Sequence, residues 1–460
     1  MSTGSMTCDA TGNNQCYKSK TWTFPVRGVT KSDLTVILNG SNYNNFTVTT
    51  NGSGDTLLNF ATNITYYGGD PGDASKVSSE LGVYIKPGSA QTGVLTQPEY
   101  DYSQLGETWS APRIFRLPNN GAGDTNIEDD IYVAAMGGGF GAQFSGFGSN
   151  LTLVNLEDIS YPGRVHNVIP IEDLSTNDIV NSTPGSSVVV TPDTARGVSF
   201  RGALIYLNDL EGKITKFNLT NMSNDGKGNA IALYDNTTLF TAGSTSTNGR
   251  YMYHSMDATI GQTTNTLWLF AGTGDYERIA DSQAGNDNLL LGIADPDYPF
   301  YRNVNTPTRA YDLSKCKNTT NDSSGASCPQ LTGDKGWYIQ LKNSAKVTAE
   351  PTVSSGLVYF PIYKPSSSVN KCSLGDAFIC AVDDECGTNI SSKLGANTGA
   401  TKNEKCKYVG QGVLSRIVTF AGKIFANIAG QSTQNKKDLV VLQGATSDVS
   451  TYRSSWRNNF

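Results

Sequence analysis

Short apolar runs recur along the chain, separated by glycine, asparagine, aspartate and serine. Runs of this length between turn-forming residues are typical of β-strands, and their regular spacing predicts a sandwich, a barrel or a propeller. No long segment repeats apolar residues at the helical period, so a helical bundle or a βαβ array is not expected. The predicted strands are residues 34–38, 131–135, 151–154, 187–190, 203–207, 213–217, 266–270, 289–293, 357–360, 377–382, 417–420 and 423–427.

One segment predicts how neighbouring strands pair. Residues 203–207 are continuously apolar, an Asp-Leu-Glu-Gly turn follows, and residues 213–217 alternate polar with apolar positions. This pattern predicts a hairpin with a buried inner strand and a half-exposed outer strand. Propeller blades show the same gradient, because their inner strands crowd round an axis while their outer strands face water. The predicted fold is therefore all-β, a modified β-propeller with long loop insertions, which fall at 219–230, 316–336, 364–376 and 388–405.

The first part of the chain is less regular than the rest. We expect a strand-rich N-terminal segment at 1–95, either an extra lobe or a divergent first blade, and a propeller domain at 96–460, with a soft boundary before Leu105. Imperfect repeats with long insertions favour a loop-decorated propeller over a compact repeat array.

Composition supports strands and limits the partners. The chain has 48 glycines and 22 tyrosines with only 17% charged residues, a mixture that favours strands and turns. A net charge of −6 and the lack of a Lys/Arg run argue against nucleic acid. No apolar stretch approaches the ~20 residues of a membrane-spanning helix. Met1–Met6 lacks the charged and apolar regions of a signal peptide, which predicts a mature or truncated chain.

Eight cysteines at loop-closing spacings predict disulfides rather than a metal site. No Cys-x-x-Cys pair is present, and the two histidines, His166 and His254, lie far from every cysteine in the sequence. Because disulfides persist in oxidising compartments, we expect an extracytoplasmic protein. The expected pairs are Cys8 with Cys16, Cys316 with Cys328, and two pairs of open connectivity among Cys372, Cys380, Cys386 and Cys406.

Candidate chemistry is sparse. Neither histidine accompanies a Gly-x-Ser-x-Gly elbow, so no catalytic residue and no cofactor site are expected, and His254 is expected on a strand beside a carbonyl group. The candidates for metal ligands are the acidic residues of one loop region, Asp275, Glu277, Asp281 and Asp287.

The glycine-rich segment 137–148 lacks the Gly-Lys-Ser/Thr signature of a phosphate-binding loop. We interpret it as a blade loop whose exposed phenylalanines, Phe140, Phe144 and Phe147, contact a partner.

Five stretches in the same order resemble the C-terminal domain of the PilY1/PilC family of type IV pilus proteins. They cover roughly residues 105–430, and the last, with its Gly-Trp, Pro-x-Val, Val-Tyr-Phe and Cys progression, is the most specific. They are Leu105–Ile114, Leu204–Phe217, Phe270–Tyr276, Leu289–Asp295, and Gly336–Leu341 continuing through Lys346–Val353 and Leu357–Phe360 to Cys372 and Ala377–Asp383.

The resemblance implies about seven propeller blades and a function in pilus extension, twitching motility and adhesion. Its implied location is the cell surface at a pilus tip, reached through the periplasm or outer membrane. The implied partners are pilin or minor pilin subunits and a host or abiotic surface.

Members of this family often carry a calcium loop before the hairpin turn. The corresponding positions here, Ala195, Gly197, Ser199 and Ala203, offer no carboxylate, so calcium control through that loop is doubtful.

Two other classes of function stay open. A quinoprotein-like dehydrogenase is also a secreted propeller, but it needs an acidic base, a cation and an apolar cofactor slot. A carbohydrate-binding or glycosidase propeller needs suitably spaced carboxylates.

Overall fold

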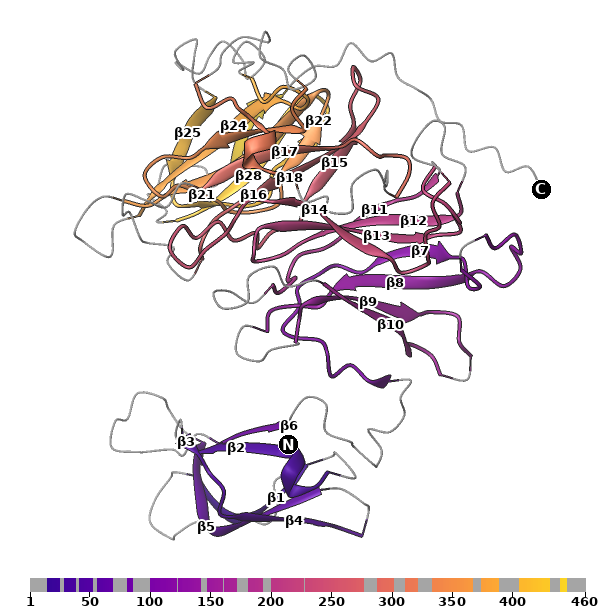
Figure 1. The fold of residues 1–460 in the computed structure, drawn as a ribbon. Coiled ribbons are helices and arrows are strands. Elements are labelled where there is room, and N and C mark those ends of the chain that lie inside the picture. The colour runs from indigo at the N-terminus through magenta and orange to yellow at the C-terminus, as the bar shows by residue number, and fades with distance from the viewer. Residues whose placement is uncertain are drawn as a thin grey trace. The chain divides into compact units, whose positions relative to one another are not determined.

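A computed structural model gives the fold of the chain (Figure 1). It describes residues 15–24, 29–38, 41–52, 56–68, 81–85, 100–121, 123–141, 147–159, 161–171, 181–192, 200–226, 228–276, 288–301, 311–321, 333–366, 374–388, 405–430 and 439–444. These residues form strands and the short 3-10 helices Lys31–Asp33 and Leu313–Lys315. Within them, no helix is long and apolar enough to cross a membrane.

The chain divides into two compact units. The first is Met1–Gln104 with Gly163–Val165, and the second is Leu105–Pro162 with His166–Phe460. The main division therefore falls at the soft boundary before Leu105, beyond residue 95.

The first unit contains two three-stranded antiparallel sheets around a small core. One sheet has the order β1 (Gln15–Phe24), β5 (Thr56–Gly68), β4 (Phe46–Thr50), and the other β3 (Ser41–Asn42), β2 (Leu34–Leu38), β6 (Leu81–Ile85). Alternate residues of β2 and β5 point into the core, as expected for sheets with one buried face. The core residues are Val29, Leu34, Val36, Phe46, Leu58 and Phe60.

The second unit is a series of five sheets, which we number in chain order. Sheet 1 contains β7 (Arg113–Leu117), β8 (Ile131–Gly137), β9 (Asn150–Asn155) and β10 (Val165–Pro170). Sheet 2 contains β11 (Val188–Val190), β12 (Gly202–Asn208), β13 (Lys213–Thr220), β14 (Asn236–Thr241) and β18 (Tyr311–Asp312). Sheet 3 contains β15 (Asp257–Ile260), β16 (Leu267–Gly272), β17 (Leu289–Asp295), β20 (Gly336–Gln340) and β19 (Lys317–Asn318).

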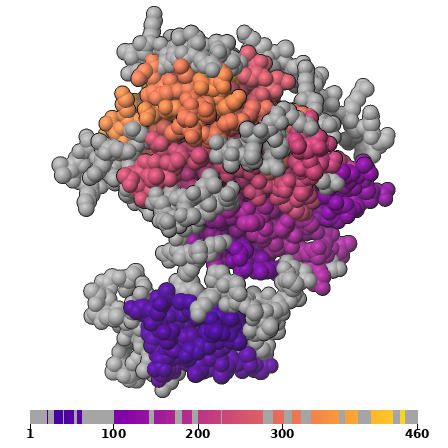
Figure 2. Space-filling model, in the orientation of Figure 1, coloured from indigo at the N-terminus to yellow at the C-terminus, as the bar shows by residue number. Residues whose placement is uncertain are grey.

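Sheets 4 and 5 each begin with an interrupted strand. Sheet 4 contains β21 (Lys346–Val347), β22 (Thr352–Ser354), β23 (Leu357–Lys364), β24 (Asp376–Asp383) and β25 (Cys406–Gln411). Sheet 5 contains β26 (Val413–Leu414), β27 (Val418–Phe420), β28 (Lys423–Ala429) and β29 (Leu439–Gln443). In Figure 2 the visible surface of the second unit passes from purple to orange, so successive parts of the chain occupy neighbouring parts of that face.

Four apolar cores separate the five sheets of the second unit. Along β12, Ala203, Ile205 and Leu207 face the core shared with sheet 1. The intervening Leu204 and Tyr206 face the core shared with sheet 3. Sheets 3 and 4 enclose a third core around Trp268 and Trp337, and sheets 4 and 5 a fourth around Tyr359 and Ile424. Because both faces of an inner sheet are buried, strands such as β12 and β16 are almost continuously apolar.

The structure confirms the all-β class, and each predicted strand overlaps an observed one. Mainly antiparallel sheets that follow one another along the chain are the arrangement of propeller blades, although β18 in sheet 2 and β19 in sheet 3 each pair in parallel with their neighbour. The described residues form five such sheets in the second unit, where the resemblance implied about seven blades.

The prediction of a half-exposed outer strand in the hairpin was wrong. All of β13 is buried, because β14 pairs with its free edge and sheets lie on both of its faces. The lysines of β13 that suggested a solvent face are instead inside the protein, with Lys213 and Lys216 each 1% exposed.

Lys216 forms a buried ion pair that joins sheet 2 to sheet 3. Its Nζ donates to Asp295 Oδ2 over 2.5 Å and to the Phe300 carbonyl oxygen over 2.6 Å. The Tyr206 hydroxyl donates to the same carboxylate oxygen over 2.6 Å. Since Asp295 is fully buried, its charge depends on these two donors and on the backbone N–H of Asp297.

We predict that Lys216→Met lowers the free energy of unfolding by about 4 kcal/mol, because Asp295 is left as a buried charge without its cation. Lys423→Met, at an exposed position of β28, is the control and should change it by less than about 0.5 kcal/mol. Urea unfolding followed by tryptophan fluorescence measures both values. Equal effects of the two substitutions would contradict the assigned role of the ion pair.

Candidate binding site at the inner strands

A cavity of about 580 Å³ lies where the first strands of the five sheets meet. Its lining includes Arg113 at the start of β7, residues of β11 and residues of β15. Glu350, just before β22, and Arg416, between β26 and β27, complete it. Every sheet of the second unit therefore contributes to this one site.

One wall of the cavity is apolar. It runs along β11 and β15 with their flanking residues, and its larger apolar side chains are Val188, Val189, Val190, Met256, Ile260 and Leu267. Among the described strands, β11 pairs only with β12, and β15 only with β16. Both are thus edge strands, and an edge strand presents backbone groups that are available for pairing.

Four charged side chains share the cavity, and three of them are held by protein partners. Arg416 Nη2 pairs with Glu350 Oε1 over 2.8 Å. Asp257 accepts hydrogen bonds from the backbone N–H of Val353 over 2.7 Å and of Ala258 over 2.9 Å. Arg113 is exposed, and its guanidinium has no hydrogen bond or ion pair with any other described residue.

Burial raises the pKa of both carboxyl groups in the cavity. For Asp257, the two backbone hydrogen bonds and the charges of Arg416 and Arg113 oppose this rise. For Glu350, the two arginines oppose it and the charge of Asp257 adds to it. The two acids and two arginines are therefore electrostatically coupled across the cavity.

Ser187 adds a polar group to the lining. The residue is 1% exposed, and its Oγ has no hydrogen-bond partner among the described residues. A buried hydroxyl without a partner is costly unless a ligand or water satisfies it. The site thus combines an apolar wall, a hydroxyl and an available guanidinium, which is an arrangement suited to binding.

The sequence did not predict this site. Arg113 and Glu350 lie in the first and last family-like stretches, but Asp257 and Arg416 are single charged residues outside any motif. All of these residues lie at or beside the first strand of a sheet. A sequence analysis that assigned the strands to the correct sheets could have found the site from this shared position.

The acidic loop predicted as a metal site is only partly described. Asp275 is buried, and its carbonyl oxygen accepts a hydrogen bond from Lys346 Nζ over 3.1 Å. Glu277, Asp281 and Asp287 lie outside the described residues, so metal binding there stays a prediction. Of the positions that replace the calcium loop, Ala203 packs in the core between sheets 1 and 2. Ala195, Gly197 and Ser199 lie outside the described residues.

The glycine-rich segment is held against the protein at its start. Phe140 is half-buried and packs on the cluster of Leu210, Tyr251 and Tyr253 instead of projecting into solvent. Isolated β-bridges of Gly139 and Phe140 to neighbouring segments account for this position. Phe147 is also half-buried, and Phe144 lies outside the described residues.

The cysteines divide into bonded and free. Cys380 and Cys406 lie opposite one another on the paired strands β24 and β25 and form a disulfide. Cys386 is also in a disulfide. Cys316 was wrongly predicted to be bonded, since it is a free thiol packed in the core between sheets 2 and 3. Burial raises its pKa to about 12. Of the other cysteines, Cys8, Cys328 and Cys372 lie outside the described residues, and the side chain of Cys16 is not described.

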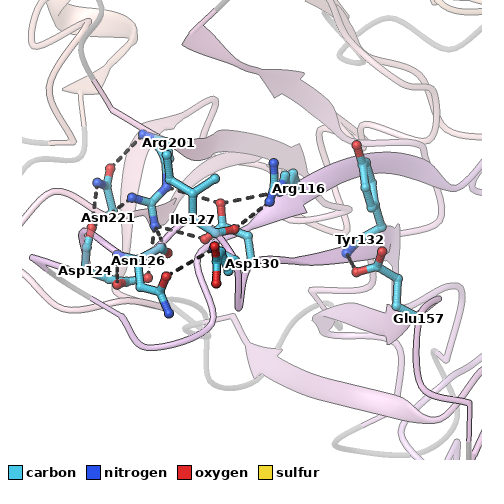
Figure 3. A network of polar contacts seen from close by, with 10 residues as sticks. Arg116, Asp124, Asn126, Ile127, Asp130, Tyr132, Glu157, Arg201 and Asn221 are labelled. Carbon is cyan, nitrogen blue, oxygen red and sulfur yellow. Dashed lines mark hydrogen bonds and ion pairs between the residues drawn. The ribbon is translucent and has the colours of Figure 1, made fainter.

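A second polar site joins sheets 1 and 2 (Figure 3). Asp124, Asp129 and Asp130, in the loop between β7 and β8, gather their carboxylates within 4.8 Å of one another. Arg201 Nη2 lies 3.0 Å from Asp124 Oδ2 and 2.9 Å from Asp130 Oδ1, and it donates to the Asn126 carbonyl oxygen over 2.8 Å. A guanidinium of the chain therefore supplies positive charge to this acidic cluster.

Both histidines bond to tyrosine hydroxyls. His166 Nε2 lies 2.8 Å from the Tyr234 hydroxyl, and His254 Nε2 lies 2.6 Å from that of Tyr276. His254 lies outside any strand, contrary to expectation, and a hydroxyl takes the place of the expected carbonyl. Because the Tyr276 hydroxyl donates to the Val347 carbonyl oxygen, His254 is left to donate to Tyr276.

No protein-family model and no curated protein sequence matches the chain. Among solved structures, it is similar to the crystal structure of the Pseudomonas aeruginosa PilY1 C-terminal domain, with 15% identity and a TM-score of 0.48, covering 87% of this chain and 82% of that one. That domain belongs to the family whose motifs the sequence resembles. A weaker similarity, with 9% identity and a TM-score of 0.27, is to an exo-1,5-α-L-arabinanase from a bovine ruminal metagenomic library, covering 73% of this chain and 95% of that one.

We predict that Arg201→Gln lowers the free energy of unfolding by about 3 kcal/mol, because the largely buried Asp124 and Asp130 lose their shared cation. Arg116→Gln is the matched control: its side chain is 44% exposed and 3.5 Å from Asp130, so less than about 1 kcal/mol is expected. Chemical denaturation gives both energies, and hydrogen exchange should show faster exchange of the 124–130 amides only in Arg201→Gln. Unchanged exchange there would refute the assignment.

Stability should depend on His254 below neutral pH. Burial lowers its pKa to about 4, whereas an unfolded chain protonates histidine near 6.5. The unfolded state therefore binds the extra proton first, and stability falls as pH drops from about 6.5 to about 4, by about 3 kcal/mol. Denaturant unfolding at pH 7 and pH 4.5 measures how much the free energy of unfolding falls with pH. This fall should be smaller for His254→Gln than for the wild type. His166→Gln is the control, and identical losses in both variants would contradict the prediction.

Proposed function

We propose that this chain is a type IV pilus-associated surface protein that acts by binding and not by catalysis. In this proposal it works at the pilus tip in pilus extension, twitching motility and adhesion. The observation that carries the proposal is the position of the family-like stretches, which occupy the core strands and the central turn of successive sheets.

These stretches correspond to structural elements in order. Leu105–Ile114 leads into β7, Leu204–Phe217 covers β12, the turn and most of β13, and Leu289–Asp295 is β17. Phe270–Tyr276 ends β16 and continues beyond it, and the last stretch runs from β20 to β24. A resemblance confined to exposed loops would carry less weight, because core strands of several sheets must change together to keep their packing.

The most family-like turn has a clear structural role. Asp209 Oδ1 accepts the Lys213 N–H over 3.0 Å, and Asp209 Oδ2 lies 3.3 Å from Lys213 Nζ. Lys213 also pairs with Glu211, and Gly212 takes a φ of +71°. The Asp-Leu-Glu-Gly sequence therefore fixes the hairpin at the centre of sheet 2, and we assign the motif to folding and not to ligand binding.

Two further observations support a secreted binding protein. The Cys380–Cys406 disulfide is suited to an oxidising compartment. In the cavity, Glu350 is paired with Arg416 and Asp257 is held by backbone N–H groups, so both carboxylates have structural partners. The presence of two carboxylates in one cavity nevertheless favours a glycosidase as the second candidate.

Deletion of the coding sequence in the cell that encodes it tests the proposal. We expect fewer surface pili and a smaller twitching zone, both restored by the wild-type gene, and we expect the protein in sheared pilus fractions by immunoblotting. Complementation with Asp257→Asn together with Glu350→Gln should restore piliation, because the proposal assigns these carboxylates no chemistry. Normal piliation after deletion, with no protein in pilus fractions, would overturn it. Release of reducing sugar from a polysaccharide, lost in the double variant, would favour the glycosidase instead.

A further inference from the structure

We propose that the cavity at the inner strands binds an extended peptide segment with an acidic side chain. In this arrangement the peptide backbone lies along the edge of β11 or β15, and its carboxylate bonds to Arg113. This inference concerns peptide binding by the cavity, which is separate from association with pili. A protein that fractionates with pili can fail to bind the peptide, and a protein that binds the peptide can be absent from pilus fractions.

The edges of the two strands provide the first argument. The cavity is lined by consecutive residues, 187–190 on one side and 256–260 on the other. It therefore extends along the length of both strands instead of contacting a single side chain of each. Strands β11 and β15 each have a ladder partner on one side only among the described strands. An extended peptide binds such an edge through main-chain hydrogen bonds, and side-chain pockets then provide the specificity.

Charge provides the second argument. Arg416 and Glu350 neutralise one another, and backbone donors hold Asp257. Arg113 is the charged group in the lining that lacks a hydrogen-bonded or ion-paired partner among the described residues. A carboxylate matches a guanidinium fork through two parallel hydrogen bonds. Because Arg113 is exposed, a chain bound beside it can continue in both directions, which fits an internal Asp or Glu better than a chain terminus.

The remaining lining provides the third argument. Its apolar side chains are aliphatic, and none of the lining residues carries an aromatic ring. The described wall therefore offers no aromatic face for stacking a base. Aliphatic side chains of a peptide fit such a wall, and Ser187 Oγ offers a hydrogen bond to a peptide group. A volume of about 580 Å³ lies within the range of ligand sites.

Fluorescence anisotropy with the full chain tests the inference. The probe is fluorescein-Gly-Val-Thr-Asp-Val-Thr-amide, and the matched probe has Asn in place of Asp. We expect the Asp peptide to bind the wild type at least about tenfold more tightly than the Asn peptide. The Asn peptide lacks the carboxylate and therefore the charged hydrogen bond to Arg113. Arg113→Gln should weaken binding of the Asp peptide by a similar factor. Arg113→Lys should weaken it by less, since lysine keeps the positive charge but not the paired donors of the guanidinium. Arg116→Gln, in the same strand but outside the cavity, should bind as wild type does.

Three outcomes would overturn the inference. The first is no binding of the Asp peptide at protein concentrations up to about 1 mM. The second is equal affinity for the Asp and Asn peptides. The third is an Arg113→Gln variant that binds the Asp peptide as tightly as the wild type does. Competition by sodium acetate as effective as competition by unlabelled peptide would also overturn it, because a small carboxylate needs no strand edge. Thermal melting of each variant shows whether lost binding reflects lost folding. The Arg113→Lys variant keeps the test decisive if Arg113→Gln is unstable.

Discussion

The second unit depends on one constraint, which is that its inner sheets are buried on both faces. A strand such as β12 must supply Ala203, Ile205 and Leu207 to one core and Leu204 and Tyr206 to the next. No residue position along it is left for water. Every polar side chain that remains in such a strand must therefore find its partner inside the protein.

The buried lysines follow from this constraint. Lys216 pairs with Asp295 across two sheets, and Lys213 pairs with Asp209 and Glu211 within one hairpin. Lys405 donates to carbonyl oxygens of Thr319 and Gly387. Each of these lysines is less than a tenth exposed. An ion pair of this kind adds little stability compared with an apolar pair, but loss of one partner is costly because the other charge is left buried and unpaired. Arg201 has the same role at the junction of sheets 1 and 2, where it faces an acidic cluster (Figure 3).

The binding site arises where the same constraint ends. The first strand of each sheet is an edge strand, so its inner side is not covered by a further strand of that sheet. Arg113, Asp257, Glu350 and Arg416 lie at or beside these strands and converge on one cavity. Sheets built for packing thus give rigid support to the residues beside their inner edges.

The sequence by itself determined the strands and their class. Runs such as 203–207 and 289–293 are apolar because both faces of their sheets are buried, and that pattern can be read without knowing the neighbours. Only the tertiary structure decided the fate of polar residues. The lysines of residues 213–217 give the alternation of a solvent-facing strand, yet sheets on both sides bury them. Cys316 has a loop-closing partner in the sequence but is a free thiol in a core. The cavity joins residues 113, 257, 350 and 416, and long-range packing of separate sheets, which no local pattern encodes, brings them together.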